Sequence, residues 1–416
     1  MGTFVIEGGR KLSGTVWISG SKNSSVALIP ACLLAEGTSR LENLALIRDV
    51  QVFARILKDL GANVDFQGHS ITISPNGFSS WKAPYDLVKQ LRASYYLMGV
   101  LLAKFGRAEV GLPGGCDIGP RPIDQHLKGF KALGADVRVE GGVVKLQAKS
   151  LKGTSIYLDI PSVGATINIM LAASRAEGTT VIENAAKEPH VVDLANFLNA
   201  MGAKVLGAGT DVIKVRGTKS LKGATHSVIP DDMEAATYMM AAVATRGNVL
   251  LRNVIPKHLE PVSAKLREAG AIVEEEGDGI RVMCDERPRA VNVKTLPYPG
   301  FPTDAQQPLV AVMATAEGTS VVQESVYDNR LGYVSELIKM GAHIKVEGRT
   351  AIVEGVPYLV GAPVKANDLR AGAALVVAGL SARGQTVVHG TELIDRGYES
   401  METKLSSLGA SIKREE

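Results

Sequence analysis

The segment 111–124 places one cysteine in a stretch of chain that suits neither a helix nor a strand. Its sequence, Gly-Leu-Pro-Gly-Gly-Cys-Asp-Ile-Gly-Pro-Arg-Pro-Ile-Asp, contains four glycines and three prolines and predicts an exposed loop. Cys116 lies in this loop, although a free cysteine is ordinarily a small buried residue. Arg121 would favour a thiolate at Cys116, whereas Asp117 would oppose it. The pattern predicts a chemically active thiol.

Positively charged side chains recur where apolar runs begin. Lys22 precedes one such run in a Ser-Lys-Asn-Ser motif, and Arg92 and Arg370 open two others, while Arg330 and Arg396 follow acidic residues. A cation beside the free backbone amides of a helix start is a natural anion site. Arginine can also bind a carboxylate or phosphate at two points. The alternatives for any one of them are a helix start with a solvated cation or a surface salt bridge.

Asp304 closes a Phe-Pro-Thr-Asp motif directly before another apolar run. Its place is equivalent to that of Lys22 and of Asp231 before their own runs. One interpretation is an ordinary helix cap. The other is a general base that the helix start holds in position, and the sequence leaves both open.

Composition narrows the function classes. Lys and Arg together number 46 against 43 acidic residues, a net charge of +3 that is too balanced for a protein that coats nucleic acid or an anionic membrane. Three cysteines without a CxxC pair, and seven histidines without i, i+4 pairing, predict no metal site. No dinucleotide or Walker A motif follows a strand. We therefore expect no metal, no nucleotide hydrolysis or dinucleotide chemistry, and no nucleic-acid or membrane partner, and the sequence specifies no oligomeric state.

We also expect a cytoplasmic protein. The first ten residues lack the apolar core of a signal peptide, and the apolar runs are shorter than the ~20 residues that cross a bilayer. Cys32 falls in a predicted buried helix and Cys284 at the end of a predicted strand, so both are expected to be structural.

A unit of about 70 residues occurs six times. A Leu-x-x-x-Gly-Ala-like phrase closes an amphipathic segment at intervals of 68 to 73 residues. Each unit has an apolar run that predicts a fully buried helix, then a glycine expected at its left-handed C-cap, a short strand, an amphipathic helix and a hairpin. The closing glycines are Gly61, Gly134, Gly202, Gly270, Gly341 and Gly409, and the expected C-cap glycines are Gly37, Gly106, Gly178, Gly247, Gly318 and Gly384.

Six such units cannot each contain a core, but three packed around their buried helices can. We therefore predict an α/β protein of two pseudo-threefold domains, each of three βαβαββ-like repeats. Residues 22–229 form the first domain, which carries the cysteine loop 112–122, and residues 1–21 plus 230–416 form the second. The segment 3–20 is expected to pair with the second domain. A solenoid is the alternative, and the lack of polar capping repeats disfavours it.

These motifs, in this order, resemble those of the enolpyruvyl transferases along the whole chain. The resemblance rests on Ser-Lys-Asn at 21–23, Leu-Pro-Gly-Gly-Cys-x-Ile-Gly-x-Arg-Pro at 112–122, Ser-Val-Gly-Ala-Thr from Ser162, Phe-Pro-Thr-Asp from Phe301 and Asp-Leu-Arg-Ala-Gly from Asp368. It implies an inside-out α/β barrel with the active site in the cleft between two threefold domains. It also implies transfer of the enolpyruvyl group of phosphoenolpyruvate to the 3′-hydroxyl of UDP-N-acetylglucosamine, by addition, elimination and domain closure, in peptidoglycan synthesis. Both substrates are small molecules, and the resemblance implies that the reaction needs no metal or organic cofactor.

The resemblance also implies roles for individual residues. Cys116 matches a proton donor, which predicts covalent inactivation by the epoxide fosfomycin, and Asp304 matches a base that can also orient the sugar hydroxyl. Lys22, Arg121, Arg370 and Arg396 would hold phosphoenolpyruvate, with Lys22 and Arg396 counted among the catalytic residues. The predicted substrate-binding residues are Lys22, Asn23, Arg92, Arg121, Pro122, Ile123, Asp124, Gln125, Ser162, Val163, Gly164, Asp304, Val326, Arg330, Arg370 and Arg396.

Three other functions compete with this one. The shikimate-pathway transferase shares the fold but lacks the cysteine loop. A catalytically silent sugar-nucleotide-binding paralogue would be expected to lose groups such as Cys116 and Asp304. An RNA 3′-phosphate cyclase type would need a nucleotidylated histidine and a more basic face. The sequence favours none of the three.

Overall fold

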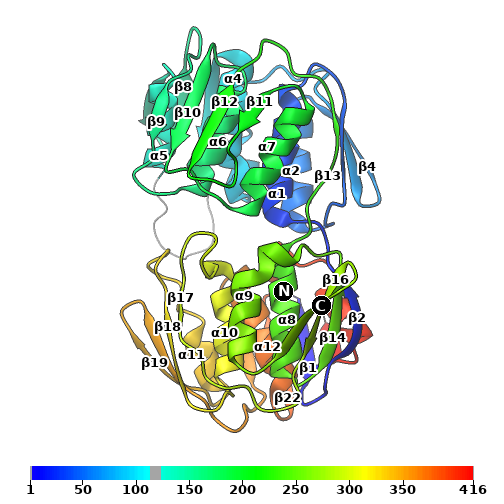
Figure 1. Cartoon of the computed structure of the whole chain (residues 1–416). Coiled ribbons are helices and arrows are strands. Elements are labelled where there is room, and N and C mark those ends of the chain that lie inside the picture. The colour runs from blue at the N-terminus through cyan, green and yellow to red at the C-terminus, as the bar shows by residue number, and fades with distance from the viewer. Residues whose placement is uncertain (1, 113–122, 416) are drawn as a thin grey trace. The chain divides into compact units, whose positions relative to one another are not determined.

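The computed structural model describes residues 2–112 and 123–415, and these form two compact units (Figure 1). The first unit comprises residues 20–112 and 123–229. The second unit comprises residues 2–19 and 230–415. Each unit has its own hydrophobic core, so the two are described separately.

Three sheets enclose three buried helices in each unit. Within a repeat, the first and second strands are parallel and the remaining pairs are antiparallel, so that the strand order in space is first, second, fourth, third. The second repeat of the first unit replaces its first strand by an isolated bridge at Lys82. This repeated α/β architecture is the one expected from the sequence.

The first unit contains three sheets, with β3 (Ser39–Glu42), β4 (Asn63–Gln67), β5 (Ser70–Ser74) and β13 (Thr225–Ser227), then β6 (Arg107–Gly111), β7 (Asp136–Glu140) and β8 (Val143–Gln147), then β9 (Ser155–Tyr157), β10 (Thr179–Glu183), β11 (Lys204–Leu206) and β12 (Val212–Arg216). Its helices are α1 (Lys22–Ala31), α2 (Arg48–Asp59), α3 (Tyr85–Val88), α4 (Leu97–Phe105), α5 (Asp124–Ala132), α6 (Val163–Ala173) and α7 (Pro189–Ala200), with short 3-10 turns η1 (Cys32–Leu34) and η2 (Arg92–Tyr96).

The second unit contains β1 (Thr3–Glu7), β21 (Pro363–Lys365), β22 (Gln385–His389) and β23 (Ser411–Glu415), then β2 (Ser13–Trp17), β14 (Asn248–Arg252), β15 (Ile272–Glu276) and β16 (Gly279–Met283), then β17 (Val293–Lys294), β18 (Thr319–Gln323), β19 (His343–Glu347) and β20 (Thr350–Glu354). Its helices are α8 (Asp232–Ala244), α9 (Pro256–Glu268), α10 (Gln306–Met313), α11 (Val334–Lys339), α12 (Leu369–Ser381), α13 (Thr391–Ile394) and α14 (Met401–Ser407), with the 3-10 turn η3 (Thr303–Ala305).

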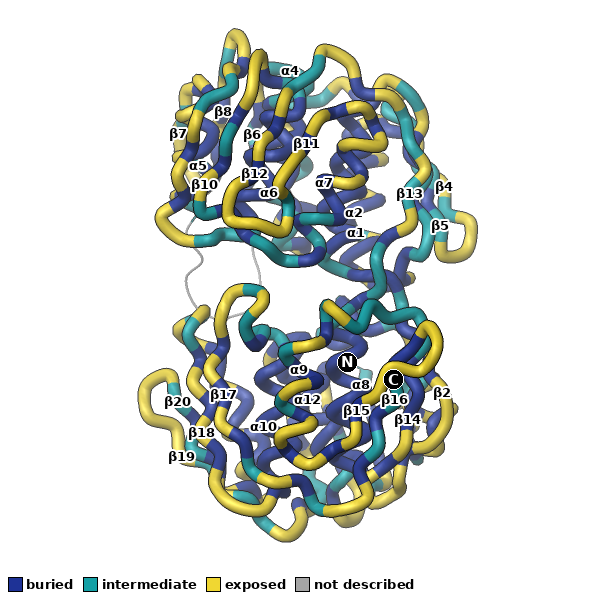
Figure 2. The backbone as a smooth tube through the Cα atoms, in the orientation of Figure 1, coloured by how far each residue is buried: buried dark blue, intermediate teal, exposed yellow. Residues whose placement is uncertain are grey.

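The central helices are buried on all sides because small and aliphatic residues surround their axes. In the second unit α8, α10 and α12 contact one another, and in the first unit α4 packs on α6 and on α1. Their backbones are dark blue along nearly their whole length in Figure 2, whereas the surrounding strands alternate between buried and exposed residues. The predicted buried runs 24–35, 165–173 and 371–380 are confirmed.

The N-terminal segment pairs with the second unit, as predicted, but forms two strands in different sheets. β1 lies between β22 and β23 and supplies the fourth strand of the last repeat, while β2 pairs in parallel with β14. Gly8 turns the chain between them, and a Cβ there would lie 2.2 Å from the carbonyl oxygen of Ala382. In the first unit a strand near the C-terminal end of the unit completes the sheet of the first repeat, because β13 pairs in parallel with β3.

Glycine recurs at two sets of positions in the repeats, and the structural reason differs between the two sets. All six closing glycines have φ between 89° and 104°, which explains why glycine recurs there. The prediction that a second set of glycines caps the buried helices is correct only for Gly106, the C-cap of α4. Elsewhere the helix ends earlier, and at the end of α8 Arg246 takes the positive φ while Gly247 is needed because a Cβ would lie 2.2 Å from the oxygen of Leu12.

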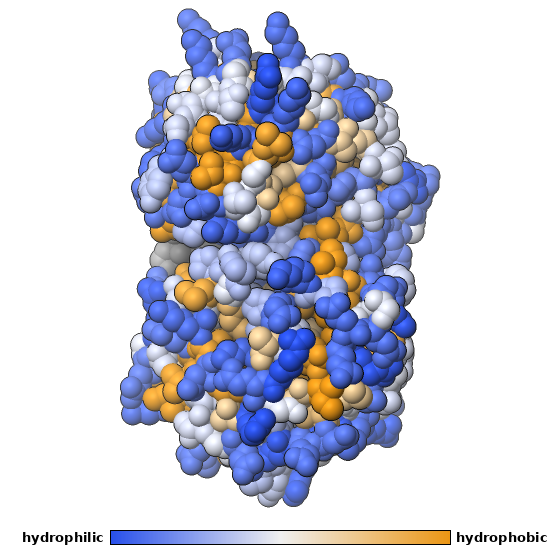
Figure 3. All heavy atoms as spheres, in the orientation of Figure 1, coloured by the Kyte–Doolittle hydropathy of each residue, from blue (hydrophilic) through white to orange (hydrophobic). Residues whose placement is uncertain are grey.

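Apolar side chains on the face shown in Figure 3 occur in small groups among polar ones. Such scattered exposure is normal for a globular surface. Among the described residues, no helix combines the length and the apolar character that a bilayer crossing requires.

Candidate active site

The second unit brings Asp304, Arg330 and Arg370 together, and we call these three residues the arginine–aspartate cluster. Asp304 lies in η3, directly before the buried helix α10, and Arg370 is the second residue of the buried helix α12. Nη2 of Arg330 donates to Oδ1 of Asp304 at 2.7 Å, and Nε of Arg370 donates to Oδ2 at 3.1 Å. Both arginine side chains are at most 4% exposed, whereas that of Asp304 is 30% exposed.

Asp304 is therefore not a helix cap. No side chain caps α10, and the carboxylate faces the two arginines instead. Burial alone would raise the pKa of the Asp304 carboxyl, but Arg330 and Arg370 hold that pKa well below its ordinary value. In this arrangement Asp304 is a negative acceptor of low basicity.

Arg370 retains one unused donor. Burial alone would lower the pKa of Arg370, but the neighbouring Tyr398, Asp304 and Asp231 raise it. The guanidinium carbon of Arg370 lies 5.3 Å from the centre of the Tyr398 ring. Nη1 of Arg370 is buried, and no described residue accepts a hydrogen bond from it. Two guanidiniums and one carboxylate leave the cluster with one net positive charge. A buried guanidinium donor that no described residue satisfies suits a small anion.

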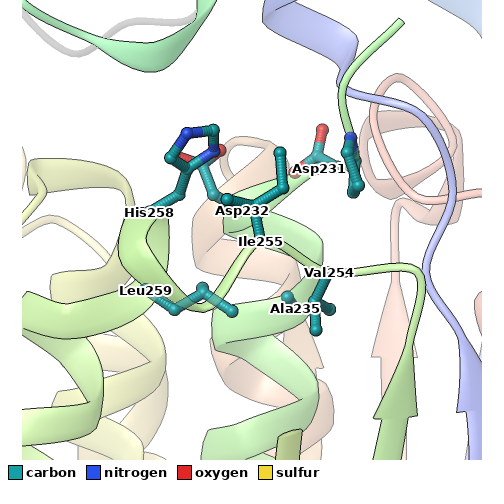
Figure 4. A pocket seen from close by; sticks show the side chains of 8 residues that line it. Asp231, Asp232, Ala235, Val254, Ile255, His258 and Leu259 are labelled. Carbon is teal, nitrogen blue, oxygen red and sulfur yellow. The ribbon is translucent and has the colours of Figure 1, made fainter. Parts of the chain in front are cut away.

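The start of α8 adds two carboxylates near Arg370. Asp231 caps the helix, with Oδ1 accepting from the backbone nitrogen of Glu234 at 2.7 Å. Burial, and then the negative charge of Asp231, raise the pKa of Asp232 to about 7. Figure 4 shows these side chains with His258 of α9 around a small depression. The depression has no enclosed room for a water molecule.

In the first unit Lys22 is the first residue of α1, behind the cap Ser21. Its Nζ lies 2.9 Å from Oδ2 of Asp49, which is buried in the first turn of α2. Two residues further along α1, Ser24 donates a short hydrogen bond to the carboxylate of Asp193, and Nε2 of His226 contacts the same carboxylate at 2.7 Å. Lys22 is thus a held cation at the start of a helix, where the helix dipole also favours an anion.

Three predicted nucleotide-sugar residues gather at the starts of α5 and α6. Gln125 is buried, accepts from the backbone nitrogen of Asp159 at 2.9 Å and donates to the carboxylates of Asp124 and Asp159. Ser162 caps α6, its Oγ accepting from the nitrogen of Ala165 at 3.3 Å. The bonds of Gln125 thus connect the start of α5 to the segment before α6.

His126 joins the α5 and α6 starts. Burial and then Arg92 lower its pKa to about 3, so the ring is neutral near neutral pH. Its Nδ1 lies 2.8 Å from the amide nitrogen of Asn168, a donor, which places the proton on Nε2. A Cβ at Gly164 would lie 2.8 Å from this ring and 2.9 Å from the hydroxyl of Tyr95. The close packing explains why glycine stands in that predicted binding motif.

The structure places the predicted residues unequally. Arg330, Arg370 and Asp304 come together in the second unit, where Val326 is 38% exposed and Arg396 is partly buried after α13. In the first unit Lys22 and Asn23 begin α1, Arg92 begins η2 one turn before α4, Ile123 and Asp124 begin α5, and Ser162, Val163 and Gly164 begin α6. Cys116, Arg121 and Pro122, with nearly all of the cysteine loop, lie outside the described residues.

Sequence reasoning missed the partners of the charged residues. Asp49, Glu324 and His126 contact Lys22, the cluster or the α6 start, yet none lies in a motif that we singled out, whereas Tyr398 ends the segment 394–398 around Arg396. Only Tyr398 gives a signal, because it stands two residues after Arg396 and a buried tyrosine hydroxyl needs a partner. Among the described residues, no group of three or more His, Cys, Asp or Glu side chains is arranged to hold a metal.

Comparison with known proteins places the chain in a family. The sequence model described as EPSP synthase (3-phosphoshikimate 1-carboxyvinyltransferase) matches residues 6–405. A relative from Symbiobacterium thermophilum named UDP-N-acetylglucosamine 1-carboxyvinyltransferase 3 is 57% identical and covers 100% of this chain and 98% of its own length. A relative from Clostridium botulinum named UDP-N-acetylglucosamine 1-carboxyvinyltransferase is 55% identical with 100% coverage of both chains.

Solved structures agree with the fold. The enolpyruvyl transferase NikO from Streptomyces tendae superposes with a TM-score of 0.89 at 27% identity and covers 99% of this chain and 98% of its own. EPSP synthase from Acinetobacter baumannii has a TM-score of 0.79 at 22% identity, with 100% of both chains covered, and supports the fold alone.

The fold and the relatives identify the chain as a transferase of a family that acts on small-molecule substrates. The chain belongs to the EPSP synthase family of carboxyvinyltransferases, the enolpyruvyl transferases.

Proposed function

We propose that the chain transfers the enolpyruvyl group of phosphoenolpyruvate to the 3′-hydroxyl of UDP-N-acetylglucosamine and releases phosphate, in the synthesis of peptidoglycan. The observation that carries the proposal is the 53–57% identity, over at least 99% of the chain, to relatives that bear the name of this activity. The donor and acceptor are cytoplasmic metabolites, so the same proposal places the protein in the cytoplasm.

The arginine–aspartate cluster suits the donor. Phosphoenolpyruvate carries a carboxylate and a phosphate, and the unused Nη1 of Arg370 and the net positive charge suit one of these groups. Lys22 and Arg396, with Arg121, supply further cations in the proposal. Fixed charges of this kind stabilise an anionic transition state without reorganising at the moment of reaction.

The reaction needs three proton transfers, two in an addition step and one in an elimination step. In the addition step the sugar hydroxyl oxygen bonds to C2 of phosphoenolpyruvate, the hydroxyl proton is removed, and a proton is added to the C3 methylene. In the elimination step C3 loses a proton and the C2–O bond to phosphate breaks. We assign the proton donated to C3 to Cys116.

Asp304 receives the hydroxyl proton or orients the hydroxyl in this proposal. Two arginine partners make it a weak base while no substrate is bound. When the carboxylate of the donor draws on the same arginines, less positive charge remains for Asp304 and its basicity rises. The arrangement thus links the base to the presence of the donor.

Phosphate release tests the proposal. The purified chain should release inorganic phosphate only when phosphoenolpyruvate and UDP-N-acetylglucosamine are both present. Shikimate 3-phosphate in place of the sugar nucleotide is the control, because the family description names that acceptor. Phosphate release with shikimate 3-phosphate, or none with UDP-N-acetylglucosamine, would overturn the assignment.

A further inference from the structure

Glu324 is a buried carboxylate in the second unit. It hydrogen-bonds both Thr303, which contacts Arg330, and the turn that carries Val326. It follows β18 directly and is 1% exposed. Its Oε1 accepts from Thr295 Oγ1 at 2.9 Å and from the backbone nitrogens of Val326 at 2.7 Å and Tyr327 at 3.1 Å. Its Oε2 accepts from Thr303 Oγ1 at 2.8 Å. In the described part of the chain it has no direct ion pair, so these four donors are what offset its burial.

One arm of this network leads to Arg330. A threonine hydroxyl has a single proton, and that of Thr303 goes to Glu324 because an ionised carboxylate can only accept. The Thr303 oxygen is therefore left as an acceptor, and Nη1 of Arg330 donates to it at 3.2 Å. Glu324 thus sets the orientation of the Thr303 hydroxyl. Thr303 in turn holds Nη1 of Arg330, while Nη2 of the same guanidinium binds Asp304.

The other arm shapes the turn 325–327. Thr295 donates to Glu324, and its oxygen accepts from the backbone nitrogen of Ser325 at 2.8 Å. Together with the two direct backbone contacts, this fixes three successive amides of the turn that carries Val326. Val326 is a predicted sugar-nucleotide contact, and its side chain is 38% exposed.

We propose that Glu324 is a positioning residue that sets Arg330 against Asp304 through Thr303 and sets the Val326 turn through Thr295 and direct backbone contacts. Glu324 itself touches neither substrate. The inference rests on the proposed function, since it concerns how the same site is held. Its two arms predict two separable kinetic effects.

The test compares three variants of the full chain in the phosphate-release assay. Thr303→Val breaks the arm to Arg330 and should lower kcat about tenfold with an unchanged KM for UDP-N-acetylglucosamine. Thr295→Val weakens the arm to the turn and should raise that KM about tenfold with kcat nearly unchanged. Glu324→Gln should do both, because its amide places a donor against donors.

Glu336→Gln is the matched control. Glu336 is 8% exposed in α11, accepts from the backbone nitrogen of Lys365 at 2.9 Å and pairs with Lys339, away from the cluster. The Glu336→Gln variant should be less stable than the wild type but keep its kcat and its KM for UDP-N-acetylglucosamine. Unchanged kinetics in both threonine variants would overturn the inference, even if Glu324→Gln fails to fold. An inactive wild-type chain would instead refute the proposed function.

Discussion

At the scale of single residues, opposite environments act on two neighbouring carboxyls. Asp304 has two arginine partners, and its pKa lies well below the ordinary value. Asp232 is partly buried beside Asp231, and its pKa is raised to about 7. The same side chain chemistry is thus strongly ionised at one position and half-protonated near neutrality at the other, because burial and neighbouring charge act in different proportions.

The raised pKa of Asp232 predicts a pH-dependent cost in stability. The folded state keeps its proton up to about pH 7, whereas the unfolded chain releases it near 3.8. The folded state therefore binds more protons between these values, and this group's contribution to stability falls as pH rises through that window. Asp232→Asn removes this cost. We therefore expect the free energy of unfolding of the variant at pH 8 to exceed that of the wild type by about 1–2 kcal/mol.

Urea unfolding at several pH values measures this difference. The gain should shrink as pH falls towards 4, because the wild-type carboxyl is then protonated in both states. A gain that is constant from pH 4 to pH 8 would mean that the substitution acts by packing.

Cys116 carries a second residue-scale prediction, which follows from the proposed proton donor. Cys116→Ala should keep the fold and substrate binding but lower kcat at least about a hundredfold, since general acid catalysis contributes that much or more. The wild type should gain the mass of one fosfomycin in an intact-mass spectrum, and the alanine variant should not. Full turnover in the variant would remove the thiol from the mechanism.

At the scale of elements, close contact between buried helices holds the first unit. Gly99 in α4 donates its backbone N–H to Oδ1 of Asn168 in α6 at 3.0 Å. A Cβ on Gly99 would lie 2.5 Å from the backbone oxygen of Asn168. The two helices can approach this closely only because one of them has no side chain at the contact.

Gly99→Ala should therefore destabilise the chain even though alanine favours helices. The methyl group meets backbone that cannot move cheaply, and we expect a loss of about 2–3 kcal/mol in the free energy of unfolding. Denaturant unfolding checks the value. Gly332→Ala is the matched control, because a Cβ there meets nothing within 4 Å and its φ is not positive, and it should change stability by less than about 0.5 kcal/mol.

At the scale of the whole molecule, the two units close differently. The described residues of the first unit, 20–112 and 123–229, include neither end of the chain, and β13 near the end of that unit completes the sheet of its first repeat. The second unit needs residues from both ends of the chain, because β1 lies between β22 and β23. This difference predicts how fragments behave.

A fragment 20–229 should fold alone, with cooperative thermal unfolding and a helical circular dichroism spectrum. A fragment 230–416 should not, because it lacks the central strand of one sheet and the edge strand of another, and both expose unpaired backbone. Fusing residues 1–19 to its C-terminus through a flexible linker should restore folding, as β1 and β23 are antiparallel neighbours. Cooperative folding of 230–416 without them would contradict this topology.

Periodicity, composition and motifs in the sequence were sufficient for the repeat, the buried helices, the hairpins and the family. These features are local, since a helix without a polar face, or a glycine at positive φ, depends on a few residues that are neighbours in the sequence. The same information could separate neither the two N-terminal strands nor the true helix ends, which depend on where each sheet and core begins.

Only the tertiary structure decided which groups meet. Whether Asp304 caps a helix or binds arginines depends on residues 26 and 66 positions away, and Glu324 gathers donors from three separate segments. The charge state of a carboxyl follows from these distant neighbours and from its burial, neither of which a local pattern contains. The sequence by itself thus determined the elements and the chemistry available at their starts, and the packing of six repeats determined how that chemistry is paired.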